Sequence, residues 1–153
     1  MSDRPGPVRV RDLEAGDLEQ LLRLSLQLRV GDLPLPRERA VALWQAILSD
    51  PAQNYLGAFA GDELVSVCCA AIVPNLTHGG RPYAVIENVV TDEAWRRKGV
   101  GRELLSAMVA RCWQRDCHKI MLMSGAARRD AHAFYEAVGF DRHAKQAFLI
   151  RRP

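Results

Sequence analysis

Residues 83–115, YAVIENVVTDEAWRRKGVGRELLSAMVARCWQR, decide the fold of this chain. The segment 83–90 is rich in Val and Ile, which is typical of a largely buried central strand. A polar loop follows over residues 91–99. Apolar side chains then recur at the spacing of an amphipathic helix, which we predict from residue 100 to about residue 115. They are Val100, Leu104, Leu105, Met108, Val109 and Cys112.

A second buried strand is predicted over residues 119–124, which contain an apolar run from Ile120 to Met123. With the strand 83–90 and the helix 100–115 it forms a βαβ crossover. Such a crossover places two neighbouring strands in parallel and packs the helix on one face of the sheet.

The remaining elements are predicted from caps, turns and periodicity. Asp17, with Gln20 three residues later, resembles a helix start. Gly61-Asp62 is a tight-turn signal between two apolar segments, so a hairpin is expected there. Gly139 is a helix C-terminal signal. The predicted elements are helices 18–29, 37–48 and 130–138, hairpin strands 55–60 and 64–73, and a final strand 148–150.

The composition fits one globular domain over residues 1–153, with 48% hydrophobic and 25% charged residues. A net charge of +3, without interleaved aromatics, argues against nucleic acid as a partner. No apolar run reaches the length of a membrane span. The polar N-terminus lacks a signal peptide, so the four cysteines are expected to be reduced thiols of a cytoplasmic protein. Cys112, Cys117 and His118 lack a second ligand pair, and no metal is expected.

The loop Arg96-x-x-Gly99-x-Gly101 lies between the buried strand and the amphipathic helix. The first turn of a helix has free N–H groups that attract an anion together with the helix dipole. Glycines let a phosphate approach this backbone, and the basic residues around it add charge. A Gly-Lys-Ser or Gly-Lys-Thr triplet and the dinucleotide fingerprint are both absent from the sequence. The predicted phosphate site comprises Arg96, Arg97, Lys98, Gly99, Val100, Gly101 and Arg102.

Two motifs together resemble the GNAT superfamily of N-acetyltransferases. Arg96, Gly99 and Gly101 match its signature Arg/Gln-x-x-Gly-x-Gly/Ala, and residues 131–140, AHAFYEAVGF, match its late helix ending in Phe-Tyr-x-x-x-Gly-Phe. The resemblance implies an α/β (α+β) GNAT fold, a mixed central sheet with a splayed parallel strand pair and flanking helices. It also implies an acetyl-CoA-dependent N-acetyltransferase. Residues 86–90 are similar to the glucosamine-6-phosphate N-acetyltransferase branch.

The resemblance further implies where acetyl-CoA lies. Its pantetheine arm would pair with the backbone of Val89 and Val90, and its pyrophosphate with the amides of residues 97–102. Many members carry Asn where this chain has Arg128, so we expect Arg128 or Arg129 to reach a cofactor phosphate instead. His132, one helical turn before the tyrosine of the motif, is assigned to the same groove. A surface position is the alternative for His132.

Transfer to an amine needs a base, because an alkylamine with a pKa near ~10.4 arrives protonated. Glu87 is the candidate base, since it interrupts an apolar strand where partial desolvation would raise its pKa. A structural or solvent-facing carboxylate is the alternative. Tyr135 is the candidate acid for the departing thiolate, with a core aromatic as the alternative. Glu87 and Asn88 should point to opposite faces of the strand unless a bulge intervenes.

The expected acceptor is a small primary amine, held between helices 18–29 and 37–48 and the loop 74–82, which carries His78. A protein-lysine or N-terminal acetyltransferase is one alternative. A catalytically weak acyl-CoA-binding regulatory domain on the same fold is another. Members of the family are frequently dimeric, so a homodimer is expected.

Overall fold

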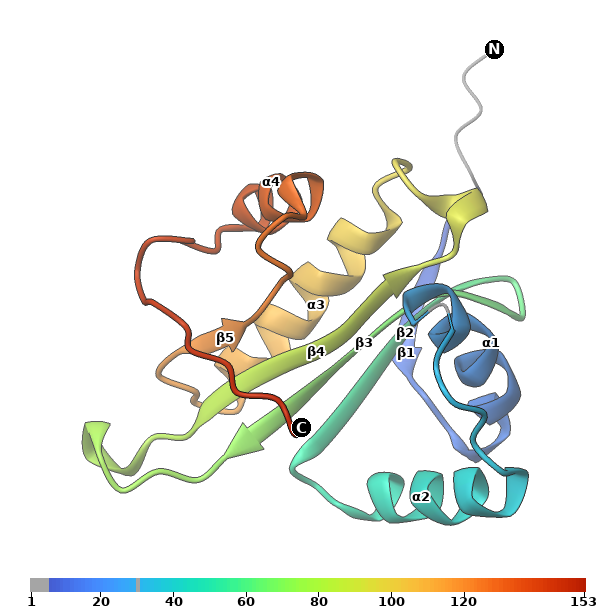
Figure 1. The fold of residues 1–153 in the computed structure, drawn as a ribbon, viewed down its shortest axis with the longest axis horizontal. Helices are drawn as coiled ribbons and strands as arrows, with labels where there is room; N and C mark the ends of the chain where they lie inside the picture. The colour runs from blue at the N-terminus through green and yellow to red at the C-terminus, as the bar shows by residue number, and fades with distance from the viewer. Residues whose placement is uncertain (1–5, 30) are drawn as a thin grey trace.

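The computed structural model describes residues 6–29 and 31–153. A five-stranded sheet has the order β1-β2-β3-β4-β5, antiparallel throughout except for the parallel pair β4–β5 (Figure 1). The α-helices pack on this sheet, α1 and α2 on one side and α3 and α4 on the other. The strands are β1 (Arg9–Asp12), β2 (Gln53–Ala60), β3 (Glu63–Val73), β4 (Tyr83–Thr91) and β5 (Ile120–Leu122), and the helices are α1 (Leu18–Leu28), α2 (Arg37–Ser49), α3 (Val100–Gln114) and α4 (Arg129–Val138).

Strands β4 and β5 with helix α3 confirm the predicted βαβ crossover. The two strands pair over only three positions, from Ala84↔Ile120 to Ile86↔Leu122. Strand β4 continues to Thr91, so its second half runs on without β5 beside it. The mixed sheet with a splayed parallel pair is therefore as predicted.

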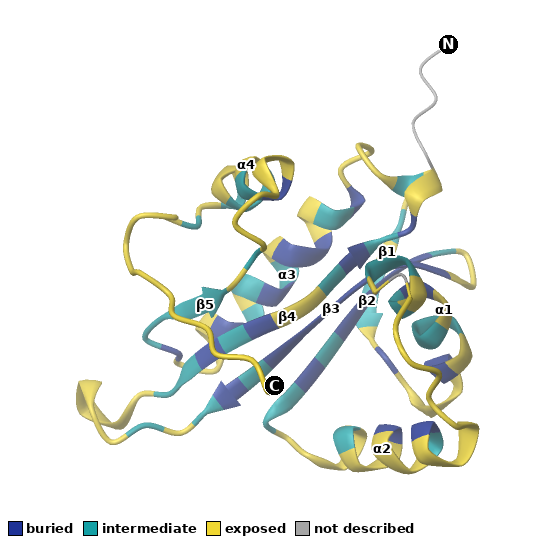
Figure 2. Cartoon of the chain, viewed as in Figure 1, coloured by how far each residue is buried: buried dark blue, intermediate teal, exposed yellow. Residues whose placement is uncertain are grey.

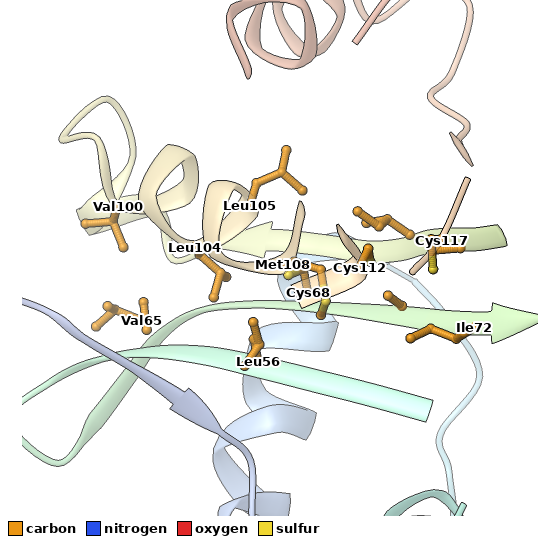
Figure 3. Close-up of a cluster of buried hydrophobic side chains, with 14 residues drawn as sticks. Leu56, Val65, Cys68, Ile72, Val100, Leu104, Leu105, Met108, Cys112 and Cys117 are labelled. Carbon is orange, nitrogen blue, oxygen red and sulfur yellow. The ribbon is translucent and has the colours of Figure 1, made fainter. Parts of the chain in front are cut away.

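The main core lies between α3 and the sheet. Five residues of the predicted apolar stripe of α3 are buried in this core, whereas Val109 is only half-buried. Figure 3 shows Leu104 and Met108 on the side of α3 that faces Leu56 and Cys68 of the central strands, and Leu105 on the other side. Burying one such side chain stabilises the fold by roughly 1.5–3 kcal/mol. A second cluster packs α1 and α2 against the other face of the sheet. With both faces covered, β3 is buried along most of its length (Figure 2).

The beginning of the chain differs from the prediction in two ways. Strand β1 was not predicted, because its sequence Arg-Val-Arg-Asp is an edge strand with exposed ends and little apolar signal. The predicted capping pair of Asp17 with Gln20 is wrong. Asp17 is buried and completes a capping box with Glu14, and it also binds Arg11. Gln20 instead bonds the backbone of the β2–β3 hairpin, accepting from the N–H of Leu64.

The predicted final strand 148–150 is wrong. These residues have no strand conformation, and the side chains of Phe148 and Ile150 are 90% and 95% exposed. Three consecutive apolar residues favour a strand only when a neighbouring strand offers a hydrogen-bonding edge. In the described part of the chain, β5 is paired with β4 alone, so its outer edge is free, but residues 148–150 do not pair with it. None of the described helices is long and apolar enough to cross a membrane.

Candidate active site

The divergence of β4 from β5 opens a cavity of about 290 Å³, which we call the splay groove. It is formed by the second half of β4, the segment after β5, the start of α4 and the end of α1. Four of the predicted site residues meet there: Glu87, Val89, Arg128 and Tyr135. The lining residues are Leu28, Arg29, Ile86, Glu87, Asn88, Val89, Leu122, Met123, Ser124, Gly125, Arg128 and Tyr135.

A β-bulge shapes the β4 wall of the splay groove. The register with β3 shifts between Cys69↔Glu87 and Val67↔Val90, and Asn88 has a φ of 53°. Asn adopts this left-handed conformation more readily than most residues. The thiol of Cys69 donates to the carbonyl of Glu87 at 3.3 Å, which holds the bulge in place. Glu87 and Asn88 were expected to point to opposite faces of the strand unless a bulge intervened. The bulge is present, and both residues line the groove.

Glu87 lies in the groove but is exposed, so the expected desolvation of its carboxylate is wrong. The apolar neighbours in the sequence face the two cores, while the bulge turns Glu87 outward. Tyr135 is half-buried, and its ring packs on Phe134 and Phe140 with centroids 5.2 and 6.3 Å away. Burial raises the pKa of Tyr135, which keeps its hydroxyl protonated at neutral pH but makes it a weaker proton donor than an exposed tyrosine.

The predicted phosphate loop joins β4 to α3. Gly99 is the N-cap of α3 with a φ of 85°, a conformation that favours glycine, and a Cβ there would meet open space. Glycine is favoured at position 101 for a different reason, because a Cβ there would lie 2.8 Å from the Thr91 hydroxyl. Arg96 donates to the carbonyl of Thr91, whereas Arg97, Lys98 and Arg102 are exposed around the loop. The Val100 side chain is buried in the core, so only its backbone can face a ligand.

A buried carboxylate that the sequence did not single out anchors this loop to α1. Asp92 accepts hydrogen bonds from Arg23 and Gln27, both at 3.0 Å, and from the backbone N–H of Ala94. Burial alone would raise the pKa of Asp92, but these hydrogen bonds and the Arg23 charge outweigh it and hold the pKa below its usual range. The start of the phosphate loop is therefore fixed by the same helix that borders the splay groove.

Ser124 is a second site residue that sequence reasoning missed. It follows β5 and lines the splay groove, and its hydroxyl is buried without a hydrogen-bond partner among the described residues. Buried polar groups in proteins are normally hydrogen-bonded. An orphaned hydroxyl at this position fits a groove that receives a ligand with amide and carbonyl groups. The feature of the sequence that could have identified Ser124 is its position just after a buried strand of the crossover.

Some predicted site residues do not line the groove. His132 bonds the carbonyl of Gly125 at 2.9 Å and so supports the turn that lines it. The side chain of Val90 is buried in the cluster under α1, and its carbonyl accepts from Ser66. Loop 74–82 lines neither cavity described here, and His78 stacks on His118 instead.

A second cavity of about 150 Å³, which we call the apolar pocket, lies between α1, α2 and the sheet. Both predicted helices contribute to its walls. It shares Leu28 and Asn88 with the splay groove, so the two cavities meet at the β4 bulge. The lining residues are Leu18, Leu21, Leu22, Ser25, Leu28, Leu35, Ala40, Leu43, Trp44, Ile47, Tyr55, Val67, Asn88 and Val90.

The four cysteines are Cys68, Cys69, Cys112 and Cys117. All four are buried free thiols, and Cys112 is part of the α3 core. Among the described residues, no three His, Cys, Asp or Glu side chains are grouped as a metal site would require.

The chain is similar to known acetyltransferases. Residues 17–140 match the model of the acetyltransferase (GNAT) family. A solved structure of a putative acetyltransferase from Agrobacterium tumefaciens str. C58 is 38% identical, with a TM-score of 0.90 over 94% of this chain and 99% of that chain.

Two curated relatives have named activities. A glucosamine 6-phosphate N-acetyltransferase from Trypanosoma brucei brucei is 32% identical over 87 residues, which span 57% of this chain and only 57% of that protein. An aminoglycoside N(6')-acetyltransferase type 1 from Stenotrophomonas maltophilia is 29% identical over 131 residues, covering 83% of this chain and 84% of that protein.

Proposed function

We propose that this chain acetylates the primary amine of a small molecule by direct attack. It belongs to the acetyltransferase (GNAT) family and is an acetyl-CoA-dependent N-acetyltransferase. One observation carries the proposal. The splay groove and the apolar pocket meet at Leu28 and Asn88, so a donor and an acceptor held in the two cavities would face each other there. Holding both reactants side by side is a large part of what such a reaction needs.

The groove offers acetyl-CoA several kinds of contact. Beyond Ile86 the β4 backbone is free of β5, so Glu87 to Val89 can pair with the amides of the pantetheine arm. The N–H groups of residues 97–102 lie at the start of α3, where a helix favours a pyrophosphate. Exposed Arg97, Lys98 and Arg102 supply countercharge there.

The residues of the groove also fit the two proton transfers. The amine nitrogen attacks the thioester carbonyl carbon, the carbon–sulfur bond breaks, and the amide forms. The Glu87 carboxylate, directly or through a water, takes one proton from the ammonium form before the attack and passes it to solvent, and it takes the second proton from the nitrogen as the amide forms. The Tyr135 hydroxyl donates to the departing thiolate and later regains its proton from solvent. Arg128, beside Tyr135 in the groove, lies near enough to place a positive charge by the developing thiolate.

Replacing Glu87 with Gln tests the base. We expect kcat/KM to fall about 10²-fold, the lower end of a typical general-base contribution, and the rise in rate with pH to flatten. Glu38→Gln, an exposed change on α2 at a residue that lines neither cavity, is the matched control. An unaltered pH profile in the Glu87 variant would remove this residue from the mechanism.

A thiol-release assay across a panel of amines tests the function itself. We expect coenzyme A to be released only when a primary amine is added. If the protein binds acetyl-CoA but releases thiol with none of the small amines, the proposal is wrong and one of the two alternative functions holds. Release with lysine peptides would favour a protein acetyltransferase, and no release at all would favour an acyl-CoA-binding regulatory domain. Cytoplasmic location and a homodimer stay predictions.

A further inference from the structure

We infer that the acceptor is a primary amine with one compact apolar group, of the size of a benzene ring or a short alkyl chain, which the apolar pocket holds. The inference rests on the proposed function, because it concerns the amine that meets acetyl-CoA at the β4 bulge. It adds the chemical class of that amine, which differs from the sugars named in the activities of the two curated relatives.

The residues that line the apolar pocket are the first reason to expect an apolar group on the acceptor. Six of the fourteen lining residues are leucines, five of them on α1 and α2, and none of the described lining residues is charged. Its polar groups are largely engaged already. The Trp44 indole N–H donates to the carbonyl of Glu14, and the Ser25 hydroxyl donates to the carbonyl of Leu21. Trp44 and Tyr55 pack edge to face at 5.2 Å, which leaves aromatic surface in the lining.

Such walls discriminate against polar acceptors. An ammonium, phosphate or hydroxyl that loses its water needs a replacement partner, and burial without one is costly. An aminoglycoside brings several ammonium groups and a sugar phosphate brings a dianion. The lining offers neither the carboxylates nor the cations that these groups require.

Size gives the second argument. The pocket has a volume of about 150 Å³. A closed, dry cavity of roughly 150 Å³ lined by aliphatic and aromatic side chains can bind benzene. The apolar pocket has this volume but is open to solvent beside Leu35 and Leu43, so it suits one such group and leaves it an entrance.

The place where the two cavities share lining residues determines which end of the acceptor faces acetyl-CoA. Asn88 lines both cavities, and Glu87, the preceding residue, lines only the splay groove. With its apolar group in the pocket, the amine end is the part that reaches the bulge, beside the Glu87 carboxylate and the acetyl group. A short spacer between ring and nitrogen, as in 2-phenylethylamine, meets this geometry.

The wild-type protein provides the main test. We would measure kcat/KM with propylamine to hexylamine, 2-phenylethylamine, glucosamine 6-phosphate and kanamycin. We expect about a fourfold rise per added methylene until the pocket is full, the factor for burying one CH₂. Kanamycin and glucosamine 6-phosphate should be at least ~10²-fold poorer. Equal or better turnover of the polar acceptors would overturn this inference and leave the proposed function intact, whereas no turnover of any amine would overturn both.

A matched pair of variants locates the effect. Ser25 lines the pocket, and Ser49 does not, yet each hydroxyl donates at 2.8 Å to the carbonyl four residues earlier in its helix. Ser25→Leu should raise the KM for 2-phenylethylamine about tenfold or more by filling the pocket, and change the KM for acetyl-CoA less than about twofold. Ser49→Leu should change neither. An unchanged amine KM in a folded Ser25 variant would contradict the assignment, and if that variant does not fold, the wild-type panel decides.

Discussion

The splay groove and the apolar pocket lie side by side, yet they are built differently. The groove follows from the course of the backbone, with diverging strands, a bulge and a helix start, and its lining includes the charged side chains of Arg29, Glu87 and Arg128. The pocket is made of side chains on two helices, and its described lining is uncharged. A donor site made by the backbone tolerates sequence change outside a few glycines. An acceptor site made by side chains changes its specificity with each substitution.

Helix α1 joins the two regions. Leu21 and Leu28 line the pocket, while Arg23 and Gln27 hold Asp92 at the start of the phosphate loop. Residues of one helix thus reach both the apolar pocket and the start of the phosphate loop. The following predictions separate the contributions of the two regions.

Gly99→Val should have the largest effect on the donor side. The φ of 85° strains any side chain, most of all a branched one, and the new atoms would stand at the helix start where the pyrophosphate is expected. We expect acetyl-CoA affinity to fall at least ~10²-fold by calorimetry. Gly139→Val is the matched control, because Gly139 also has a positive φ and open space around it but ends α4. Equal affinity losses in both variants would mean that strain, and not the phosphate site, is responsible.

Tyr135→Phe should come next and should affect turnover alone. Loss of the proton donor is expected to lower kcat about 10²-fold, while the KM for acetyl-CoA stays within about twofold, since the ring packing is kept. Tyr83→Phe, at the far end of β4 from the bulge, serves as the control. A Tyr135 variant with wild-type kcat would return this residue to the role of a core aromatic.

Asp92→Asn should weaken the link between the two regions. We expect a loss of about 1–3 kcal/mol in the free energy of unfolding at neutral pH, the scale for hydrogen bonds to a buried charged group. Because the folded-state pKa of Asp92 is lowered, the contribution of its charge is present above the unfolded pKa and is lost as pH falls through the folded one. The stability difference between wild type and variant should therefore shrink in acid.

Asp50→Asn is the matched control for this change. Asp50 also accepts from the N–H two residues later, at 2.9 Å, but it is exposed. Denaturant titrations of both variants from neutral to acidic pH would check the prediction. A stability loss in the Asp92 variant that stays constant down to acidic pH would contradict the role of its charge.

Ser124→Ala should have the smallest effect, and with opposite signs in two measurements. Removing an orphaned buried hydroxyl should raise the free energy of unfolding by up to about 1 kcal/mol. If that hydroxyl pairs with the cofactor arm, acetyl-CoA affinity should fall about threefold to tenfold. Ser106→Ala, exposed on α3, is the control. Unchanged affinity would exclude Ser124 from the donor site.

The sequence predicted the crossover and the loop before α3 well, because their determinants are local. Two glycines, a run of basic residues and an amphipathic helix after a buried strand specify the crossover and the loop, and the Phe-Tyr motif brings α4 to it. The bulge at Asn88 was considered but could not be predicted, because the alternation of side chains along a strand does not indicate which residue adopts a left-handed conformation. For the same reason the exposure of Glu87 was missed.

Features that depend on distant partners were predicted poorly. Asp92 is significant only because Arg23 and Gln27, more than sixty residues earlier, reach it. Ser124 becomes notable only once β5 ends beside the groove. Residues 148–150 have the apolar character of a strand, but no strand forms beside them in the described chain. Leucine periodicity predicted α1, whereas the pocket depends on how α1 and α2 pack on the sheet.

The central claim is that a charged donor groove and an apolar acceptor pocket meet at Leu28 and Asn88. A coenzyme A thioether joined through an acetyl linker to an alkylamine would occupy both cavities at once, and its Kd can be measured without turnover. We expect the Kd to fall about fourfold for each methylene added to the alkyl group, from ethyl to pentyl. A Kd independent of chain length, or tighter binding of the analogue carrying glucosamine 6-phosphate, would contradict this account.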